Sequence, residues 1–244
     1  MKILRLASIL MAALVTLAPV TGAAPKKSKS GDLTWSHPEF ARFGVDRIAM
    51  IPVVTYNNDL PSEKQVEGVI GMSLHESGYR WISAGTTREL LRALAPGDSI
   101  LKAVRQSVLT NARVDSASAS NLCARLRCRA LLSVRVDQWE KREIEWDQSG
   151  KPSTSIRLRA ALVDSTGALL WSVASGETAE GPYHDANATP MGMSGGGLQQ
   201  TPVTGQGGAP DFIEVTTTIT KRWATLFPAK SAAPADSTAA APAR

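Results

Sequence analysis

Apolar and polar residues alternate along residues 129–139. The apolar positions are Leu132, Val134 and Val136, and the positions between them carry polar or charged side chains. A period of two is typical of a β-strand with one buried face. A helical pattern precedes this segment and further alternating runs follow it, so we place it at the centre of one mixed β-sheet.

The first strand of that sheet is predicted over residues 47–54. Its continuous apolar run, Ile48–Ile51, is expected for a strand that is covered on both faces. A helix and then a short strand over residues 79–83 follow it. The order strand, helix, strand predicts a right-handed crossover and parallel pairing.

The later strands are predicted to be antiparallel. Residues 156–162 and 169–173 alternate on either side of Asp164–Gly167, which is a strong hairpin-turn sequence. Residues 140–155 are mostly polar, with turn residues at 147–152, and predict a long hairpin whose tips extend beyond the core. The predicted fold class is therefore α/β: a single mixed β-sheet of about five strands packed with helices, with a parallel strand-helix-strand start and antiparallel hairpins at the end.

Helices are predicted from apolar residues at helical spacing and from capping residues. Capping-box patterns at Ser62–Gln65 and Thr86–Glu89 indicate two helix starts. Asp98 is predicted to cap a third helix, a fourth starts near Ser116, and Asp211 is predicted to cap the last one. The fourth helix is expected to dock beside the central strand.

Residues 1–23 have the pattern of a secretory signal peptide. Lys2 and Arg5 form a positive start, and the apolar run Ala7–Val15 is too short to span a bilayer. Cleavage is the favoured interpretation and an uncleaved anchor is the alternative, and either one exports the folded part. No cysteine lies near the predicted cleavage site, so lipid attachment is not expected. The predicted location is the periplasm, with full secretion as the alternative.

The rest of the chain divides into three segments. Residues 24–44 are predicted to be a polar tether, 45–228 an α/β domain, and 229–244 a disordered tail rich in Ala, Pro and Ser. Within the domain, residues 181–210 carry many Gly, Pro, Met and Gln residues without periodicity and are predicted to form a flexible loop. A domain of about 180 residues is large enough to bury a substantial core.

The net charge of the chain argues against one class of partner, nucleic acid. The chain carries a formal net charge of +5, and loss of Lys2 and Arg5 with the signal peptide lowers it by two, to +3. Lys26, Lys27 and Lys29 lie in the predicted tether, so the folded part is close to neutral. A protein that binds nucleic acid would carry a denser basic stripe with interleaved aromatic residues, so no nucleic-acid partner is expected.

Cys123 and Cys128 fall where a predicted helix meets the central strand. Export to an oxidising compartment permits a disulfide between them. Residues five apart in a continuous helix point to different sides, so this bond requires the helix to end by about Arg127. Two buried thiols are the alternative. The three histidines lie far apart in the sequence without metal-ligand spacing, and no metal or other cofactor is expected.

Candidate partner-binding residues lie on the polar hairpin. Trp146 is predicted either to be exposed for partner binding or to pack in the core, and Glu143 and Glu145 precede it. The nearby Asp137 and Glu140 do not suggest an acid–base pair, because lysine and arginine are interleaved with these acids as on a solvated surface. No catalytic residue is therefore assigned.

The order of the segments resembles that of bacterial envelope proteins with a domain like that of the curli-secretion channel lipoprotein. The amino-terminal domain of TolB and the penicillin-binding-protein activator lipoproteins are similar. The resemblance covers residues 45–227 and rests on Arg47–Pro52, Ser77–Ile82, Leu122–Trp139 and Leu158–Trp171, in which Leu162–Trp171 resembles the hairpin of the family. It implies a largely non-enzymatic protein that acts through assembly and protein contacts.

Two features depart from that group. Its members are usually lipid-anchored, and this chain has no cysteine placed for a lipid. Channel formers in the group also carry membrane-crossing hairpins, whereas the hairpin over residues 140–155 is too polar and short to cross a bilayer.

The sequence features and the resemblance allow three functions. The first is an exported, non-enzymatic cell-envelope protein that acts by protein–protein contacts in envelope assembly or secretion. The second is an auxiliary component of an envelope transport system or a small-ligand carrier, with a pocket lined by Trp81, Trp139 or Trp171. The third is an enzyme. The expected partners are envelope proteins, while peripheral membrane association and oligomeric state stay open.

Overall fold

The computed structural model of this chain describes residues 26–27, 31–93, 97–145, 147–185 and 208–230. The predicted signal peptide, most of the predicted flexible loop and most of the predicted tail therefore lie outside the described residues, and so does Trp146.

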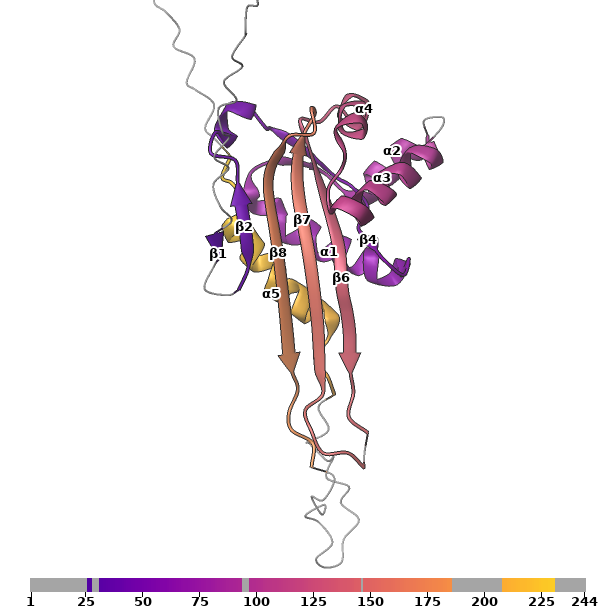
Figure 1. Ribbon diagram of the computed structural model, residues 1–244, viewed down its shortest axis with the longest axis vertical. Coiled ribbons are helices and arrows are strands. Elements are labelled where there is room, and N and C mark those ends of the chain that lie inside the picture. Colours follow the sequence, from indigo (N-terminus) through magenta and orange to yellow (C-terminus); the bar gives the residue numbers. More distant parts are fainter. Residues whose placement is uncertain (1–25, 28–30, 94–96, 146, 186–207, 231–244) are drawn as a thin grey trace, which may run out of the picture.

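One mixed sheet organises the described residues, which confirms the predicted fold class (Figure 1). It has eight strands rather than about five, in the order β1-β2-β8-β7-β6-β3-β5, with β4 paired to β6. Strand β3 pairs in parallel with β5 and β6, and the long strands β6, β7 and β8 pair antiparallel. The strands are β1 (Lys26–Lys27), β2 (Leu33–Ser36), β3 (Arg47–Met50), β4 (Val54–Thr55), β5 (Arg80–Ile82), β6 (Ala130–Arg142), β7 (Ser153–Asp164) and β8 (Leu169–Glu180).

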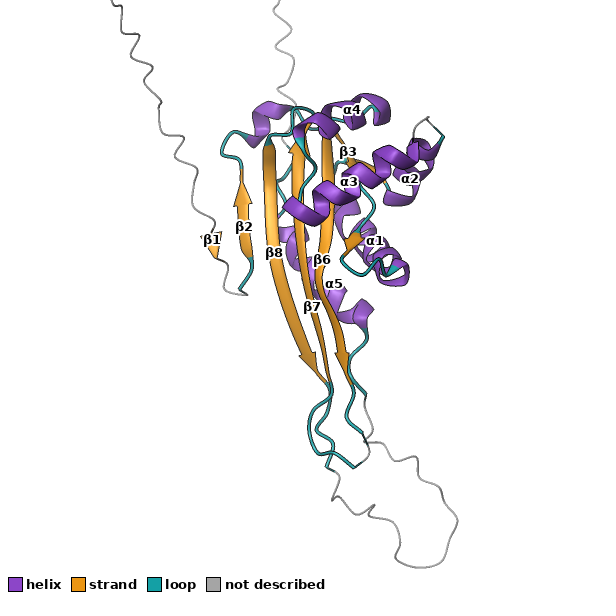
Figure 2. Ribbon diagram, turned by 45° about the vertical axis from the view of Figure 1, so that its right-hand side comes forward, coloured by secondary structure: helices purple, strands orange, loops and turns teal. Residues whose placement is uncertain are grey.

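Helices lie against both faces of the sheet (Figure 2). Helices α1 and α5 pack on one face, and α2, α3 and α4 pack on the other. The doubly covered part of the sheet, which contains β3, β5 and residues 130–136 of β6, is called the body. The helices are α1 (Leu60–Leu74), α2 (Ala84–Arg92), α3 (Gly97–Asn111), α4 (Ser116–Leu126) and α5 (Phe212–Leu226), with the short 3-10 helices η1 (Phe40–Phe43) and η2 (His75–Ser77).

Strand β6 lies at the predicted place, between β7 and β3. Leu132, Val134 and Val136 are at most 3% exposed and belong to the core beneath α1 and α5. The prediction of a single buried face was incomplete, because Ser133 and Arg135 are also buried, at 0% and 6% exposure. Helix α3 packs on the side of β6 that these polar side chains face.

The strands β6, β7 and β8 continue past α2, α3 and α4, so that helices cover only one face of their outer part, where Trp139 stacks on Phe212 of α5 (Figure 2). This outer part, residues 138–142, 153–157 and 176–180, is called the arm. A β-bulge between Val136 and Gln138 marks the point where β6 passes from the body into the arm. The strands are longer than predicted because the polar residues that weaken the alternation still form the backbone ladder.

Part of the predicted tether over residues 24–44 belongs to the sheet, so the prediction was wrong there. Strand β2 pairs with β8, and Asp32 just before it is fully buried. Arg222 of α5 donates to both carboxylate oxygens of Asp32, from Nε at 2.9 Å and from Nη2 at 3.4 Å. Four strand residues are too few to show a clear alternation, and the partner of Asp32 lies 190 residues away in the sequence.

Two predicted helix starts are confirmed by their caps. The Asp211 carboxylate accepts a hydrogen bond from the Ile213 backbone N–H at 2.7 Å, and α5 begins directly after it. Asp115 accepts from the Ser118 backbone N–H at 2.8 Å, so the fourth helix begins at Ser116 as expected.

The capping boxes predicted two other starts wrongly. Helix α1 begins before Ser62, because Pro61 fits the first turn of a helix, where its missing N–H costs nothing. Helix α2 is capped by Ser83, whose Oγ accepts from the Thr86 backbone N–H at 3.1 Å. Asp98 lies inside the first turn of α3 and is not its cap.

The predicted hairpin turn between β7 and β8 is present. Asp164 Oδ1 accepts from the backbone N–H groups of Thr166 and Ala168 at 2.9 and 2.8 Å. Gly167 has a φ of +84°, and a Cβ at this position would overlap the backbone of Ser116. The glycine therefore allows both the turn and the close approach of α4.

Candidate functional site

One face of the sheet is left partly uncovered. Helices α2, α3 and α4 cover this face over the body, but much of β7 and β8 and the arm lie beyond them (Figure 2). Two adjoining hollows of about 390 Å³ and 480 Å³ lie there. We call this surface the open face, and it includes Leu33, Trp35, Arg113, Gln138, Arg157, Arg159, Ser172, Ala174, Gly176 and Thr178.

Strand pairing explains why these residues share a face. Side chains alternate between the two faces of a sheet, and directly paired residues lie on the same face. Arg157 is paired with Gln138 on one side and Gly176 on the other. Its neighbours Ile156 and Leu158 point the opposite way and are buried beneath the helices. The alternation of β7 thus places arginines at successive positions of the open face.

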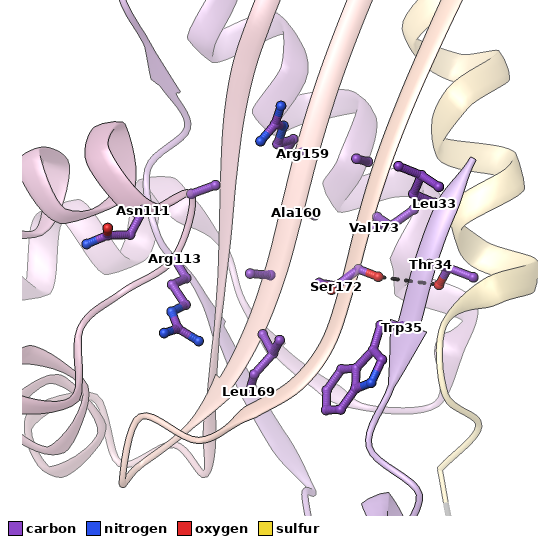
Figure 3. Close-up of a pocket in the computed structure, with 13 residues that line it drawn as sticks. Leu33, Thr34, Trp35, Asn111, Arg113, Arg159, Ala160, Leu169, Ser172 and Val173 are labelled. Atoms are coloured by element: carbon purple, nitrogen blue, oxygen red, sulfur yellow. Dashed lines mark hydrogen bonds between the residues drawn. The ribbon is translucent and has the colours of Figure 1, made fainter. Parts of the chain in front are cut away.

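The first hollow lies between strand β2 and the segment that follows α3. Leu33 and Trp35 border it on the β2 side, and Asn111 and Arg113 lie on the other side (Figure 3). Leu33 is 47% exposed, which is high for a leucine on a strand. The hollow therefore combines an exposed apolar edge with cationic side chains.

Charge on the open face is predominantly positive. Arg159 Nε lies 2.6 Å from Asp137 Oδ2, and Arg135 Nε donates to Asp137 Oδ1 at 2.7 Å. Within the described part of the chain, Arg113 and Arg157 take part in no ion pair. A partner with an acidic surface would be attracted to this face and oriented by it.

Asp137 was predicted to lie on a solvated hairpin surface, and this was wrong. Its side chain is only 11% exposed and is held between two arginines. One of them, Arg135, also donates to the Leu109 carbonyl of α3 at 2.7 Å and lies 5.3 Å from the ring centre of Tyr56. The ion pairs of Asp137 therefore stabilise the fold. Glu140, by contrast, is exposed and accepts from its neighbour Gln138 at 3.0 Å.

Glu143 and Glu145, two of the predicted partner-binding residues, lie beyond the arm, at the hairpin tip. Glu143 Oε2 accepts from the Ala209 backbone N–H at 2.9 Å, and its other oxygen lies 2.9 Å from Lys141 Nζ. The hydrogen bond with Lys141 lowers the pKa of Glu143. The Glu145 carbonyl accepts from the Gln148 N–H at 3.0 Å. Glu143 therefore ties the tip to the chain before α5, and a partner-binding role for either residue stays a prediction.

Both described ends of the long loop over residues 181–210 are fixed to this tip. The Gly181 N–H donates to the Pro152 carbonyl at 2.8 Å, and Gly150 and His184 form a two-hydrogen-bond bridge. Lys151 Nζ lies 2.8 Å from Glu180 Oε2. With the Ala209–Glu143 hydrogen bond, the described residues on both sides of this loop therefore lie at the end of the arm.

The tryptophans that were considered for a carrier pocket are engaged in packing. The ring centre of Trp171 lies 4.9 Å from that of Phe227, and Trp81 lies 5.8 Å from the same ring. Trp139 stacks on Phe212 with a centroid separation of 4.4 Å. None of these three tryptophans lines the two hollows of the open face, and a carrier pocket at these residues stays a prediction.

Cys123 and Cys128 lie side by side as buried thiols. Helix α4 ends at Leu126, and Arg127 adopts a left-handed conformation, which turns the chain back as the disulfide prediction requires. The two sulfur atoms are 3.5 Å apart, within hydrogen-bonding distance. The hydrogen bond with Cys128, followed by burial, raises the pKa of the Cys123 thiol. A disulfide at this site stays a prediction.

The open-face arginines were missed at the sequence level. Arg157 and Arg159 occupy alternate positions within a run that was assessed only for its apolar residues. The sequence did contain a signal for a basic surface, because two arginines two positions apart lie on the same face of a strand. Leu33 gave none, because β2 itself was not predicted.

The described residues contain neither a metal-binding cluster nor a membrane-spanning helix. Among them, no group of three or more His, Cys, Asp or Glu side chains is placed to hold a metal ion. None of their helices has the length and apolar character needed to cross a membrane.

Comparison with known proteins gives distant structural similarities. No protein-family model and no curated protein matches this sequence. A PelC dodecamer from Paraburkholderia phytofirmans is 15% identical, with 78% of this chain and 93% of that chain covered and a TM-score of 0.41. Lipoprotein GNA1162 from Neisseria meningitidis is 18% identical, with 55% and 83% covered and a TM-score of 0.39. The hypothetical protein CT253 from Chlamydia trachomatis is 14% identical, with 56% and 72% covered and a TM-score of 0.32. These values are too low for a function to be transferred to this chain.

Proposed function

We propose that this protein is exported to the bacterial periplasm and acts there, without catalysis, through contacts with other envelope proteins during assembly or secretion. The observation that carries the proposal is the open face, a hollowed sheet surface bordered by β2 and by the segment after α3. Export is supported by the signal-peptide pattern of residues 1–23.

The open face has the features of a protein-binding surface. It joins an exposed leucine and a tryptophan to arginines, and arginine and aromatic residues are enriched where proteins bind one another. It is carried on long paired strands, so its backbone is held in a fixed position before a partner arrives. The cations favour an acidic partner surface.

Site-specific photo-crosslinking in the native envelope tests the proposal. A photoreactive phenylalanine derivative replaces Arg157 on the open face in one strain and Gln65 on the exposed side of α1 in another. The expected result is a discrete protein adduct from the open-face position and none from the α1 position. Charge reversal of Arg113 to Glu, an exposed side chain at the edge of the first hollow, should weaken the adduct formed from position 157, because the partner is attracted by positive charge.

Equal adducts from both positions, or no adduct from either, would contradict the proposal. All three substituted side chains are exposed, and an unchanged thermal unfolding transition of the purified proteins shows that each variant folds.

A further inference from the structure

A crevice lies at the carboxyl ends of the parallel strands, away from the open face. After β3 the chain passes to α1 on one face of the sheet, and after β5 it passes to α2 on the other. Strands β3 and β5 are neighbours, so their connections diverge at this point. In open α/β sheets, ligands bind in the crevice that such a divergence leaves beyond the strand ends.

The crevice has a volume of about 280 Å³ and a two-part lining. Apolar side chains come from Val54 of β4, Leu60 of α1 and Leu101 of α3. Leu60 is 59% exposed, at the mouth of the crevice. The charged part of the lining contains two carboxylates, Glu63 and Asp98, and four cationic side chains, two from α2 and two from α3: Arg88, Arg92, Lys102 and Arg105.

A buried carboxylate holds Arg105 in place. Glu63 is 2% exposed, and its Oε1 accepts from the backbone N–H of Thr55 at 3.0 Å and from Arg105 Nη2 at 2.7 Å. The same guanidinium nitrogen donates to the Thr55 carbonyl at 3.0 Å. The network joins α1, β4 and α3, so the wall of the crevice is fixed before any ligand enters.

Arg88 is held by a second carboxylate. Its Nη2 lies 2.6 Å from Glu67 Oε1, which also accepts from the Val53 backbone N–H at 3.0 Å. Desolvation by burial raises the pKa of Glu67, an effect that the charge of Arg88 opposes. Arg88 and Glu67 together therefore contribute little net charge to the crevice.

The remaining charges leave one cation in excess. Arg92 Nε lies 4.0 Å from Asp98 Oδ1, and both side chains are exposed, so this pair is weak. Lys102 is exposed and forms no ion pair with any other residue that the structure describes. With three carboxylates set against four cations, the site is complementary to a single negative charge.

We propose that this crevice binds a small organic monoanion, with its carboxylate next to Lys102 and Arg92 and its apolar body against Leu60 and Leu101. The charged and apolar halves of the lining define the ligand class. The site makes the protein a binder of a small molecule as well as of a protein partner, and it does not depend on the open face.

Phenylacetate is a suitable probe because two matched compounds separate the two halves of the site. Phenylacetamide has the same shape without the charge, and acetate has the charge without the ring. Titrations of the purified exported protein, labelled with 15N, are followed by amide chemical shifts. Phenylacetate is expected to shift resonances in residues 51–55 and 97–105, and to bind at least about tenfold more tightly than either matched compound.

Substitution of the excess cation tests the assigned position. Lys102→Gln should weaken phenylacetate binding about tenfold, which corresponds to the loss of one charge-assisted hydrogen bond. Lys221→Gln removes an exposed lysine from α5, on the other side of the sheet, and should leave binding unchanged. Leu60→Ser should weaken phenylacetate more than acetate, because it removes apolar contact only.

Four results would overturn the proposal: no shift at millimolar phenylacetate, shifts located elsewhere, equal affinity for phenylacetamide, or unchanged affinity in Lys102→Gln. The substituted lysine is exposed, so the variant is expected to fold, and an unchanged unfolding transition checks this.

Discussion

Strand β6 passes through two different environments, and the difference shows where this protein is built for stability and where for contact. In the body, all residues from Ala130 to Val136 are buried, including Ser133 and Arg135. In the arm, beyond the bulge, exposure rises until Glu140–Arg142 are exposed at the surface. A strand covered on both faces must pair its polar side chains inside the protein, whereas a strand covered on one face can leave them to water or to a partner.

The largest expected effect is at Trp171, on the buried face of the sheet. Its ring is 0% exposed, and its Nε1 donates to the Leu226 carbonyl at 3.1 Å. Trp171→Ala should lower the free energy of unfolding by about 4 kcal/mol, because it leaves a large cavity and an unpaired carbonyl. Trp139→Ala in the arm removes a partly buried ring that stacks on Phe212. It should lower the free energy of unfolding by about 2 kcal/mol. Urea unfolding measures both, and equal losses would remove the distinction between body and arm.

The second effect compares two arginines, Arg135 in the body and Arg157 on the open face. Arg135→Ala should cost about 3 kcal/mol, because it takes one of two cations away from the largely buried carboxylate of Asp137. Arg157→Ala should change stability by less than about 0.5 kcal/mol, because the side chain is exposed. A similar loss for both variants in urea unfolding would show that the open face is structural.

A third effect concerns Asp115, which caps the helix that covers the body. Hydrogen bonding from the Ser118 backbone N–H lowers the pKa of Asp115. Stabilisation by a group with a depressed pKa is present above its ordinary pKa and is lost as the pH falls through the lowered value. Asp115→Ala should therefore cost about 1 kcal/mol at neutral pH and less in acid, as thermal unfolding at several pH values would show. Asp115→Asn keeps a capping oxygen and should lose less; a pH-independent cost of Asp115→Ala would argue against the charged cap.

The smallest effect is expected at Glu143, near the tip of the arm. Its pKa is also lowered, by the hydrogen bond with Lys141, but both groups are well exposed. Glu143→Gln keeps an acceptor for the Ala209 N–H and should change stability by less than about 0.5 kcal/mol, with the difference disappearing in high salt. Urea unfolding measures this change. A loss of more than about 1.5 kcal/mol in the free energy of unfolding would mean that the tip is coupled to the core.

The sequence alone determined the elements whose signals are local. The alternation of Leu132, Val134 and Val136 located the central strand, and Asp164–Gly167 located the hairpin turn. Asp211 located the start of the last helix. Each of these signals depends on residues within a few positions of one another, because strand alternation, turns and caps are formed by neighbours along the chain.

The tertiary structure decided which polar residues are buried and which surfaces stay open. Nothing near Asp32 in the sequence shows that Arg222 will neutralise it, and nothing near Asp137 shows that α3 will cover its arginine partner. The open face and the charged crevice have the same origin: each is lined by side chains from segments far apart in the sequence. Long-range packing sets burial, and burial decides whether a charge stabilises the fold or is left for a ligand.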